Sequence, residues 1–83
     1  MNNQNIFSTD SFNLASYLLS EGVPLLSTDN SNRKRVLFIF RESPKRQKLT
    51  GEFLSHKAKT EPHKLVSAQK DLKQILYDLN RSS

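Results

Sequence analysis

The sequence of 83 residues contains no cysteine and no tryptophan, only two glycines and three prolines, and no long hydrophobic run. The lack of cysteine excludes disulfides, thiol catalysis and thiolate metal sites. The scarcity of glycine and proline argues against a long disordered or low-complexity chain. No stretch approaches the ~20 apolar residues that span a bilayer, and Met1–Asn5 lacks the basic and apolar regions of a signal peptide. We therefore expect a soluble, cytoplasmic protein without a membrane partner.

Positive charge is also missing from the first third of the chain. Residues 1–32 contain three acids and no lysine or arginine, whereas residues 33–73 contain twelve lysines and arginines against four acids, a net charge of +8. The whole chain carries +5 at pH 7. The chain is thus electrically polarised along its sequence, and the fold decides whether it is also polarised in space.

The N-terminal half predicts a strand, a helix and a hairpin. Residues 6–9 are β-compatible, and Asp10 offers an N-cap oxygen to a helix over 11–21, after which Gly22 suits a helix C-terminus. Residues 23–27 and 35–41 predict a β-hairpin across the Asp- and Asn-rich turn 28–32. The second hairpin strand is apolar on both faces, which fits a strand covered on two sides or one that is partly shielded on its second side.

Two further helices are predicted in the C-terminal half. Ser43 and Pro44 are an N-cap and first-turn pair, so helix two begins there and runs to about Ser55, with Leu49 and Phe53 facing inward. Pro62 opens helix three. Its apolar positions repeat at helical spacing, at Leu65, Ala68, Leu72, Ile75, Leu76 and Leu79.

The predicted fold class is α+β: a small antiparallel sheet built on one β-hairpin and packed by three α-helices on one face. We expect one domain over 1–83 with flexible ends at 1–5 and 80–83, and short edge strands near Phe7 or Lys59. Helix three is expected to contribute most of the buried area. The predicted core is Leu14, Leu18, Leu25, Val36, Phe38, Phe53, Leu65, Leu72, Ile75 and Leu76.

The same residues carry a resemblance that extends from about residue 6 to residue 77. Its elements are Phe7-Ser8-Thr9-Asp10, Leu14-Ala15-Ser16-Tyr17-Leu18 up to Gly22, Arg35–Phe40, Leu49–Phe53, Lys57-Ala58-Lys59, Pro62, and Leu72-Lys73 with Ile75 and Tyr77. In these segments the chain resembles a family of short uncharacterised proteins, a domain of unknown function seen in candidate-phylum bacteria and phages. It departs from that pattern at Thr60, where valine is usual, and at Leu65, where an aromatic is usual. The resemblance implies a one-domain α+β fold and carries over no activity and no functional residue.

No catalytic constellation is apparent. His56 and His63 would need a further metal ligand such as Glu52 or Glu61, and two exposed histidines at a helix junction are the simpler interpretation. Ser8, Thr9 and Asp10 lie close in sequence, but helix capping by Asp10 explains them. Neither glycine has another glycine near it in the sequence, so there is no glycine-rich phosphate-binding loop. We expect no enzyme activity, no metal and no cofactor.

The cationic segment is the one feature that indicates a function. We expect a phosphate-binding surface if the hairpin turn and the helix ends converge, with Lys57, Lys59 and Lys64 nearby. Its predicted nucleic-acid-binding residues are Arg33, Lys34, Arg35, Arg41, Lys45, Arg46 and Lys48. The partner is then DNA or RNA. The alternatives are an acidic protein partner, with the chain acting as an adaptor or regulator of a larger protein, and a cationic surface with no partner.

A membrane-surface role for helix three is the weaker alternative. Its polar side carries Lys64, Lys70 and Lys73, but Asp71 and Asp78 interrupt it and tryptophan is absent. Packing of its apolar side on the hairpin is the simpler interpretation.

Overall fold

The computed structural model describes residues 5–32 and 34–82, which form three strands and three helices. The strands are β1 (Ile6–Thr9), β2 (Leu25–Asp29) and β3 (Leu37–Arg41), and the helices are α1 (Phe12–Ser20), α2 (Pro44–Leu54) and α3 (Pro62–Ser82). The predicted α+β class is confirmed. Residues 80–82, expected within a flexible end, belong to α3.

The sheet is antiparallel with strand order β1-β3-β2, so β3 is central and pairs with both neighbours. The predicted hairpin is confirmed as β2–β3, but its first strand is shifted by two residues, so Thr28 and Asp29, expected in the turn, pair with β3. β1 supplies the edge strand expected near Phe7, whereas Lys59 lies outside any strand. β2 begins at Leu25, directly after Pro24, and takes the other edge, where a missing backbone N–H is tolerated. Leu26 is an extra residue in the register opposite β3, a bulge that bends this edge.

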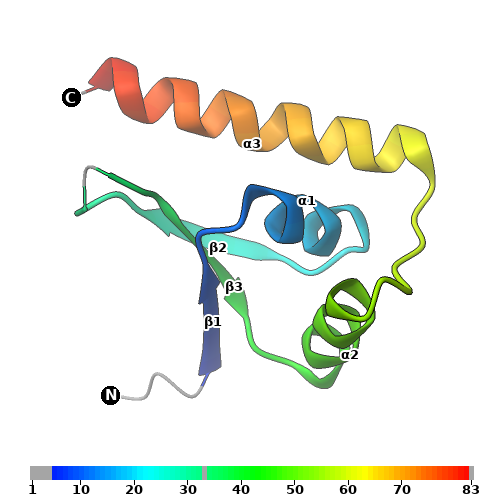
Figure 1. Ribbon diagram of the computed structural model, residues 1–83. Helices are drawn as coiled ribbons and strands as arrows, with labels where there is room; N and C mark the ends of the chain where they lie inside the picture. Colours follow the sequence, from blue (N-terminus) through cyan, green and yellow to red (C-terminus); the bar gives the residue numbers. More distant parts are fainter. Residues whose placement is uncertain (1–4, 33, 83) are drawn as a thin grey trace.

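α1 is the central helix of the fold. Figure 1 shows α1 lying between the sheet and α3, with α2 beyond the end of β3. Five consecutive α1 residues, Leu14 to Leu18, are therefore buried, whereas α3 buries Ala68 and Leu72. The prediction that helix three provides most of the buried area is wrong, because α3 packs chiefly on α1 rather than on the hairpin.

The core combines predicted and unpredicted residues. Leu14, Leu18, Phe38 and Leu72 are buried as expected, and Leu25, Phe53, Ile75 and Leu76 pack against them half-buried. Val36 and Leu65 are half-buried and lie outside this cluster. The cluster further includes Ala15, Tyr17, Val23, Phe40 and Leu49. On the second face of β3, Leu37 and Ile39 are half-buried, so the strand is covered on one side and partly shielded on the other.

Helix ends follow local chemistry with one correction. Ser43 caps α2 by accepting from the Arg46 N–H at 3.1 Å, as predicted. The N-cap of α1, however, is Ser11, whose Oγ accepts from the Leu14 N–H at 3.0 Å, and not Asp10. At the other end of α1, Gly22 has a φ of 91°. The Val23 N–H donates to the Leu18 carbonyl and the Gly22 N–H to the Leu19 carbonyl, which completes a Schellman motif.

α2 ends in the same motif without a glycine. His56 adopts a φ of 62°, the Lys57 N–H donates to the Glu52 carbonyl at 2.7 Å, and the His56 N–H donates to the Phe53 carbonyl at 3.2 Å. The left-handed conformation that the motif needs is thus taken by histidine, which accepts it at a cost that glycine does not incur. His56 is exposed and its role here is to end a helix.

Candidate nucleic-acid interface

The predicted cationic cluster divides into two groups at opposite ends of β3. The hairpin group is Lys34 and Arg35, in the turn that leads into β3; Arg33, predicted with them, lies outside the described residues. The α2 group is Arg41, Lys45 and Lys48, at the end of β3 and the start of α2. Six residues of extended chain between Arg35 and Arg41 span about 20 Å. Figure 1 shows the β2–β3 turn on the side of the molecule away from α2, so the two groups do not converge into one cluster.

The hairpin group is balanced by acids. The Arg35 Nη1 lies 3.0 Å from the Asp10 Oδ2, with both side chains about half exposed. Asp29, at the end of β2, accepts from the Ser31 N–H at 2.9 Å, and this hydrogen bond lowers the pKa of Asp29. Asn32 accepts from the Lys34 N–H at 2.9 Å in the same turn. Two carboxylates, Asp10 and Asp29, thus offset the charge of the two described cations of this turn.

The α2 group keeps its charge. Arg41, Lys45 and Lys48 are exposed, and none of them lies in an ion pair with another described residue. The positive end of the α2 macrodipole adds to the same electrostatic field. The Lys45 Nζ extends toward the C-terminus of α1, where a Cβ built on Gly22 would lie 3.4 Å from it. Of the predicted residues, these three are the exposed cations without an ion pair near the junction of β3 and α2, and we call them the α2 surface. Arg41 points to the face of the sheet opposite Phe40, whereas Lys45 extends toward the C-terminus of α1.

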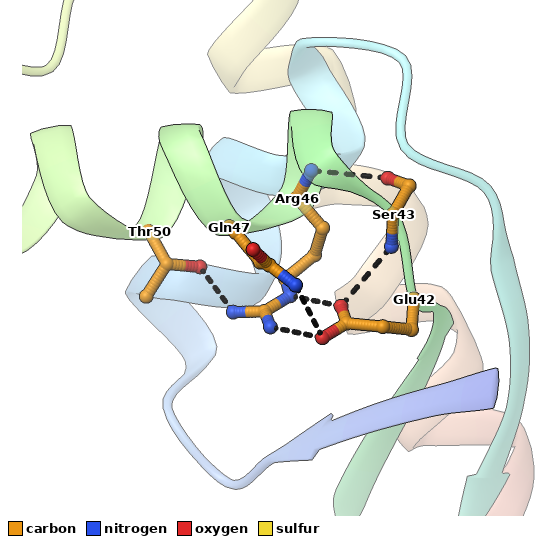
Figure 2. A network of polar contacts seen from close by, with 5 residues as sticks. All are labelled: Glu42, Ser43, Arg46, Gln47 and Thr50. Atoms are coloured by element: carbon orange, nitrogen blue, oxygen red, sulfur yellow. Dashed lines mark hydrogen bonds and ion pairs between the residues drawn. The ribbon is translucent and has the colours of Figure 1, made fainter. Parts of the chain in front are cut away.

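Arg46 belongs to an internal network rather than to this surface. Its Nε donates to the Glu42 Oε1 at 2.7 Å and its Nη2 to the Glu42 Oε2 at 2.6 Å, a bidentate pair that Figure 2 shows beside the start of α2. Its Nη1 donates to the Thr50 Oγ1 at 3.2 Å, and its guanidinium carbon lies 3.9 Å from the centroid of the Phe7 ring. The Arg46 side chain is only 11% exposed. Its guanidinium therefore links β1, β3 and α2, and its charge is neutralised.

Glu42 is the acceptor at the centre of this network. Besides Arg46, it accepts from the Ser43 N–H at 3.1 Å and from the Gln47 Nε2 at 3.3 Å, as Figure 2 shows. These donors, Arg46 foremost, lower the pKa of Glu42 to about 2. The network fixes the junction between β3 and α2 and so holds the α2 surface in place.

The remaining predicted cations lie elsewhere. Lys57 and Lys59 are exposed in the link that follows α2, and Lys64 is exposed in the first turn of α3. α2 has eleven residues, so its two ends are about 16 Å apart. The link cations are thus a separate feature from the α2 surface.

A cavity of about 300 Å³ lies between α1, the end of α2 and α3, and it is lined by Asn13, Tyr17, Phe53, Ala58, Thr60, Leu65 and Gln69. The Tyr17 and Phe53 rings stack with centroids 5.9 Å apart. Burial raises the pKa of the Tyr17 hydroxyl, which donates to the Glu52 Oε1 at 3.4 Å. Among the residues that line it there is no pair of nucleophile and base.

The described part of the chain holds neither a cluster of metal ligands nor a membrane-spanning helix. No three His, Asp or Glu side chains within residues 5–32 and 34–82 are grouped so that they could hold a metal ion. In the same ranges no helix is both long enough and apolar enough to cross a membrane.

Comparison with known proteins identifies a family. No curated protein and no solved structure matches this chain. The sequence profile of one family matches residues 4–78, nearly the whole length, and so covers every strand and the helices up to the last turn of α3. The resemblance seen in the sequence is thereby confirmed, and the chain belongs to the family described as a domain of unknown function (DUF5659).

Proposed function

We propose that this protein is a small, nonenzymatic nucleic-acid-binding accessory domain that contacts phosphates through the α2 surface. The observation that supports this most directly is the set of three exposed cations, Arg41, Lys45 and Lys48, that no described carboxylate neutralises. Phosphate contacts by such cations gain free energy from counterion release and require no base-specific motif. The hairpin group, with Arg33, is a secondary contact because Asp10 and Asp29 offset its charge.

Two structural features favour phosphate binding by the cations of the α2 surface. Arg41 ends the central strand, and the N-cap and proline at Ser43 and Pro44 fix the direction of α2. The Glu42–Arg46 network links the residue after β3 to the first turn of α2 and so fixes the backbone from which the three cations extend.

The test is fluorescence anisotropy with labelled single- and double-stranded DNA and RNA, from low to physiological salt. We expect binding that weakens steeply with salt. The triple variant Arg41→Ala/Lys45→Ala/Lys48→Ala should weaken it and reduce the salt slope by about one for each phosphate that is no longer neutralised. The matched control Lys57→Ala/Lys59→Ala removes charge at the far end of α2 and should have a smaller effect. Absence of binding at low salt would overturn the proposal.

A second candidate is a protein-interaction adaptor that regulates a larger partner, and one observation favours it. The face of the sheet opposite the helices carries Ile6, 39% exposed, with the half-buried Leu37 and Ile39, and the bulge residue Leu26 at the β2 edge is 44% exposed. An adaptor would bury these side chains against its partner. In that case Leu26→Ser and Ile39→Ser would abolish capture of one protein, whereas the Arg41/Lys45/Lys48 variant would retain it.

A further inference from the structure

The solvent-exposed side of α3 carries cations and one aromatic ring in a row. Residues 66, 70, 73, 77 and 81 repeat at intervals of three and four, so they lie along one side of the helix, opposite the buried Ala68 and Leu72. We call Val66, Lys70, Lys73, Tyr77 and Arg81 the α3 stripe, which is about 22 Å long. All five side chains are exposed.

The two acids of α3 stand in different relations to this stripe. Asp71 directly follows Lys70 and has no stripe residue three or four positions away, so it lies off the row. Asp78 accepts from the Gln74 Nε2 at 3.0 Å and is three residues from Arg81, so it lies beside that end of the stripe. Among the described residues, Lys70, Lys73 and Arg81 take part in no ion pair, and Lys70 and Lys73 have no acid of α3 three or four residues away.

Tyr77 is the unusual member of the stripe. Its side chain is 58% exposed and packs on none of the buried residues of the core. The Arg81 guanidinium carbon lies over its ring, 5.5 Å from the centroid, so a planar cation covers one face of an exposed aromatic ring and leaves the other face for a base. Unstacked nucleobases are recognised by aromatic rings and guanidinium planes of this kind.

We propose that the α3 stripe binds single-stranded nucleic acid, with Lys70 and Lys73 on the phosphates and a base stacked on Tyr77 beside Arg81. A duplex keeps its bases stacked and paired, so it cannot offer a free base face to Tyr77. An acidic protein segment would use the cations but not the ring. This surface is separate from the α2 surface, and the inference rests on the proposed function in that the protein binds nucleic acid.

The chain offers a direct optical readout of this contact. It has no tryptophan and two tyrosines, of which Tyr17 is 4% exposed, so a ligand that reaches the surface can quench only the emission of Tyr77 by stacking. We expect unlabelled oligo(dT) to quench part of the tyrosine emission, saturably and less at high salt. Tyr77→Ala should weaken binding about tenfold or more, whereas Tyr77→Phe, which keeps a ring, should bind nearly as the native protein does.

The cations are tested with a control on the same helix. Lys70→Ala/Lys73→Ala should weaken binding and reduce the salt slope by about 0.7 for each phosphate that the variant no longer neutralises. Lys64→Ala removes an exposed charge of α3 that points away from the stripe, two residues and thus about 200° from Val66, and should change affinity little. Circular dichroism of each variant confirms that it is folded.

The outcomes separate this inference from the proposed function. If the Arg41/Lys45/Lys48 variant loses affinity and the Tyr77 and Lys70/Lys73 variants do not, the α3 stripe is not a binding surface, while the proposed function stands. Loss confined to the α3 variants supports the stripe and overturns the α2 surface. Equal affinity for duplex and single strand, or binding without quenching of tyrosine emission, overturns the stacking of a base on Tyr77.

Discussion

Removal of the Glu42–Arg46 pair should cost more stability than its position near the surface implies. Arg46→Ala deletes a bidentate pair, a hydrogen bond to Thr50 and the contact with the Phe7 ring. The Glu42 carboxylate, 24% exposed, would retain donors only from Ser43 and Gln47. Charge-assisted hydrogen bonds and a partly buried cation–π contact together predict a loss of about 2–3 kcal/mol in the free energy of unfolding.

The pKa of Glu42 gives an independent bound on this energy. Its depression from 4.5 to about 2 would correspond to at most about 3 kcal/mol at pH 7 if it were fully expressed. Solvent screening at a carboxylate that is a quarter exposed reduces the coupling between Glu42 and Arg46 to about 1–2 kcal/mol. Because the folded pKa lies below the unfolded one, this stabilisation is present above pH 4.5 and is lost as the pH falls toward 2.

The assay is urea unfolding of the native protein, Arg46→Ala, Glu42→Gln and the double variant, at pH 7 and in steps down to pH 2. The double-mutant cycle isolates the coupling energy. The stability difference between the native protein and Glu42→Gln should shrink as the pH falls below 4.5. Lys48→Ala, an exposed neighbour, is the control and should change stability by less than about 0.5 kcal/mol. A coupling energy near zero, or a Glu42→Gln difference that does not vary with pH, would refute the reasoning.

Three further predictions concern the core, the helix ends and the buried tyrosine. Leu72→Ala, at a site with 0% exposure, should lower the free energy of unfolding by about 2–5 kcal/mol; an unchanged melting temperature would show that α3 does not pack on the core through Leu72. Gly22→Ala should cost about 1–2 kcal/mol because φ is 91°, whereas His56→Gly should stabilise by up to about 1 kcal/mol because φ is 62°. In thermal melts, destabilisation by His56→Gly would contradict the assignment of His56, and no loss on Gly22→Ala would contradict that of Gly22. Burial raises the pKa of Tyr17 above 10, so an ultraviolet absorbance titration should show one phenol ionising late, a feature that Tyr17→Phe removes. Since the raised pKa favours the neutral phenol in the folded state, this stabilisation is present below pH 10 and is lost as the pH rises through the folded value.

The elements could be predicted from the sequence because their signals are local. Ser43 and Pro44 specify the start of α2 through one hydroxyl and one fixed φ, and the structure uses both. At α1 two neighbouring residues, Asp10 and Ser11, could each cap the helix. Asp10 is paired with Arg35, 25 residues away in sequence, and Ser11 caps instead. The helix begins one residue later than the predicted cap implies, and the pairing of Asp10 with Arg35 is a tertiary contact that no local pattern contains.

The core was less predictable because α1 is buried on two sides. An amphipathic pattern indicates one buried face, but α1 lies between the sheet and α3, so Ala15 and Tyr17 are buried together with Leu14 and Leu18. Ser16, at 0% exposure, is accommodated because its Oγ donates to the Phe12 carbonyl at 2.7 Å. Sequence periodicity therefore identified the helix and underestimated how much of it is enclosed.

A run of cations in a sequence does not show which of them are exposed and unpaired in the fold, and the candidate site is the clearest example. Glu42 and Arg46 are four residues apart, but Glu42 precedes the Ser43 N-cap and lies outside α2, so the i,i+4 rule for helices does not predict their ion pair. The contact of Arg46 with Phe7 was out of reach, because it depends on the register that pairs Phe7 with Phe40 and places both rings on the helix side of the sheet. In the fold, Arg46 is largely buried and Arg35 forms an ion pair with Asp10. The cations of the α3 stripe stay exposed because the opposite side of that helix packs on the core. The charge available to a partner therefore depends on which cations are buried or paired in the fold. The α3 stripe, for which the sequence suggested only the weaker membrane-surface alternative, carries as many cations without an ion pair among the described residues as the α2 surface does.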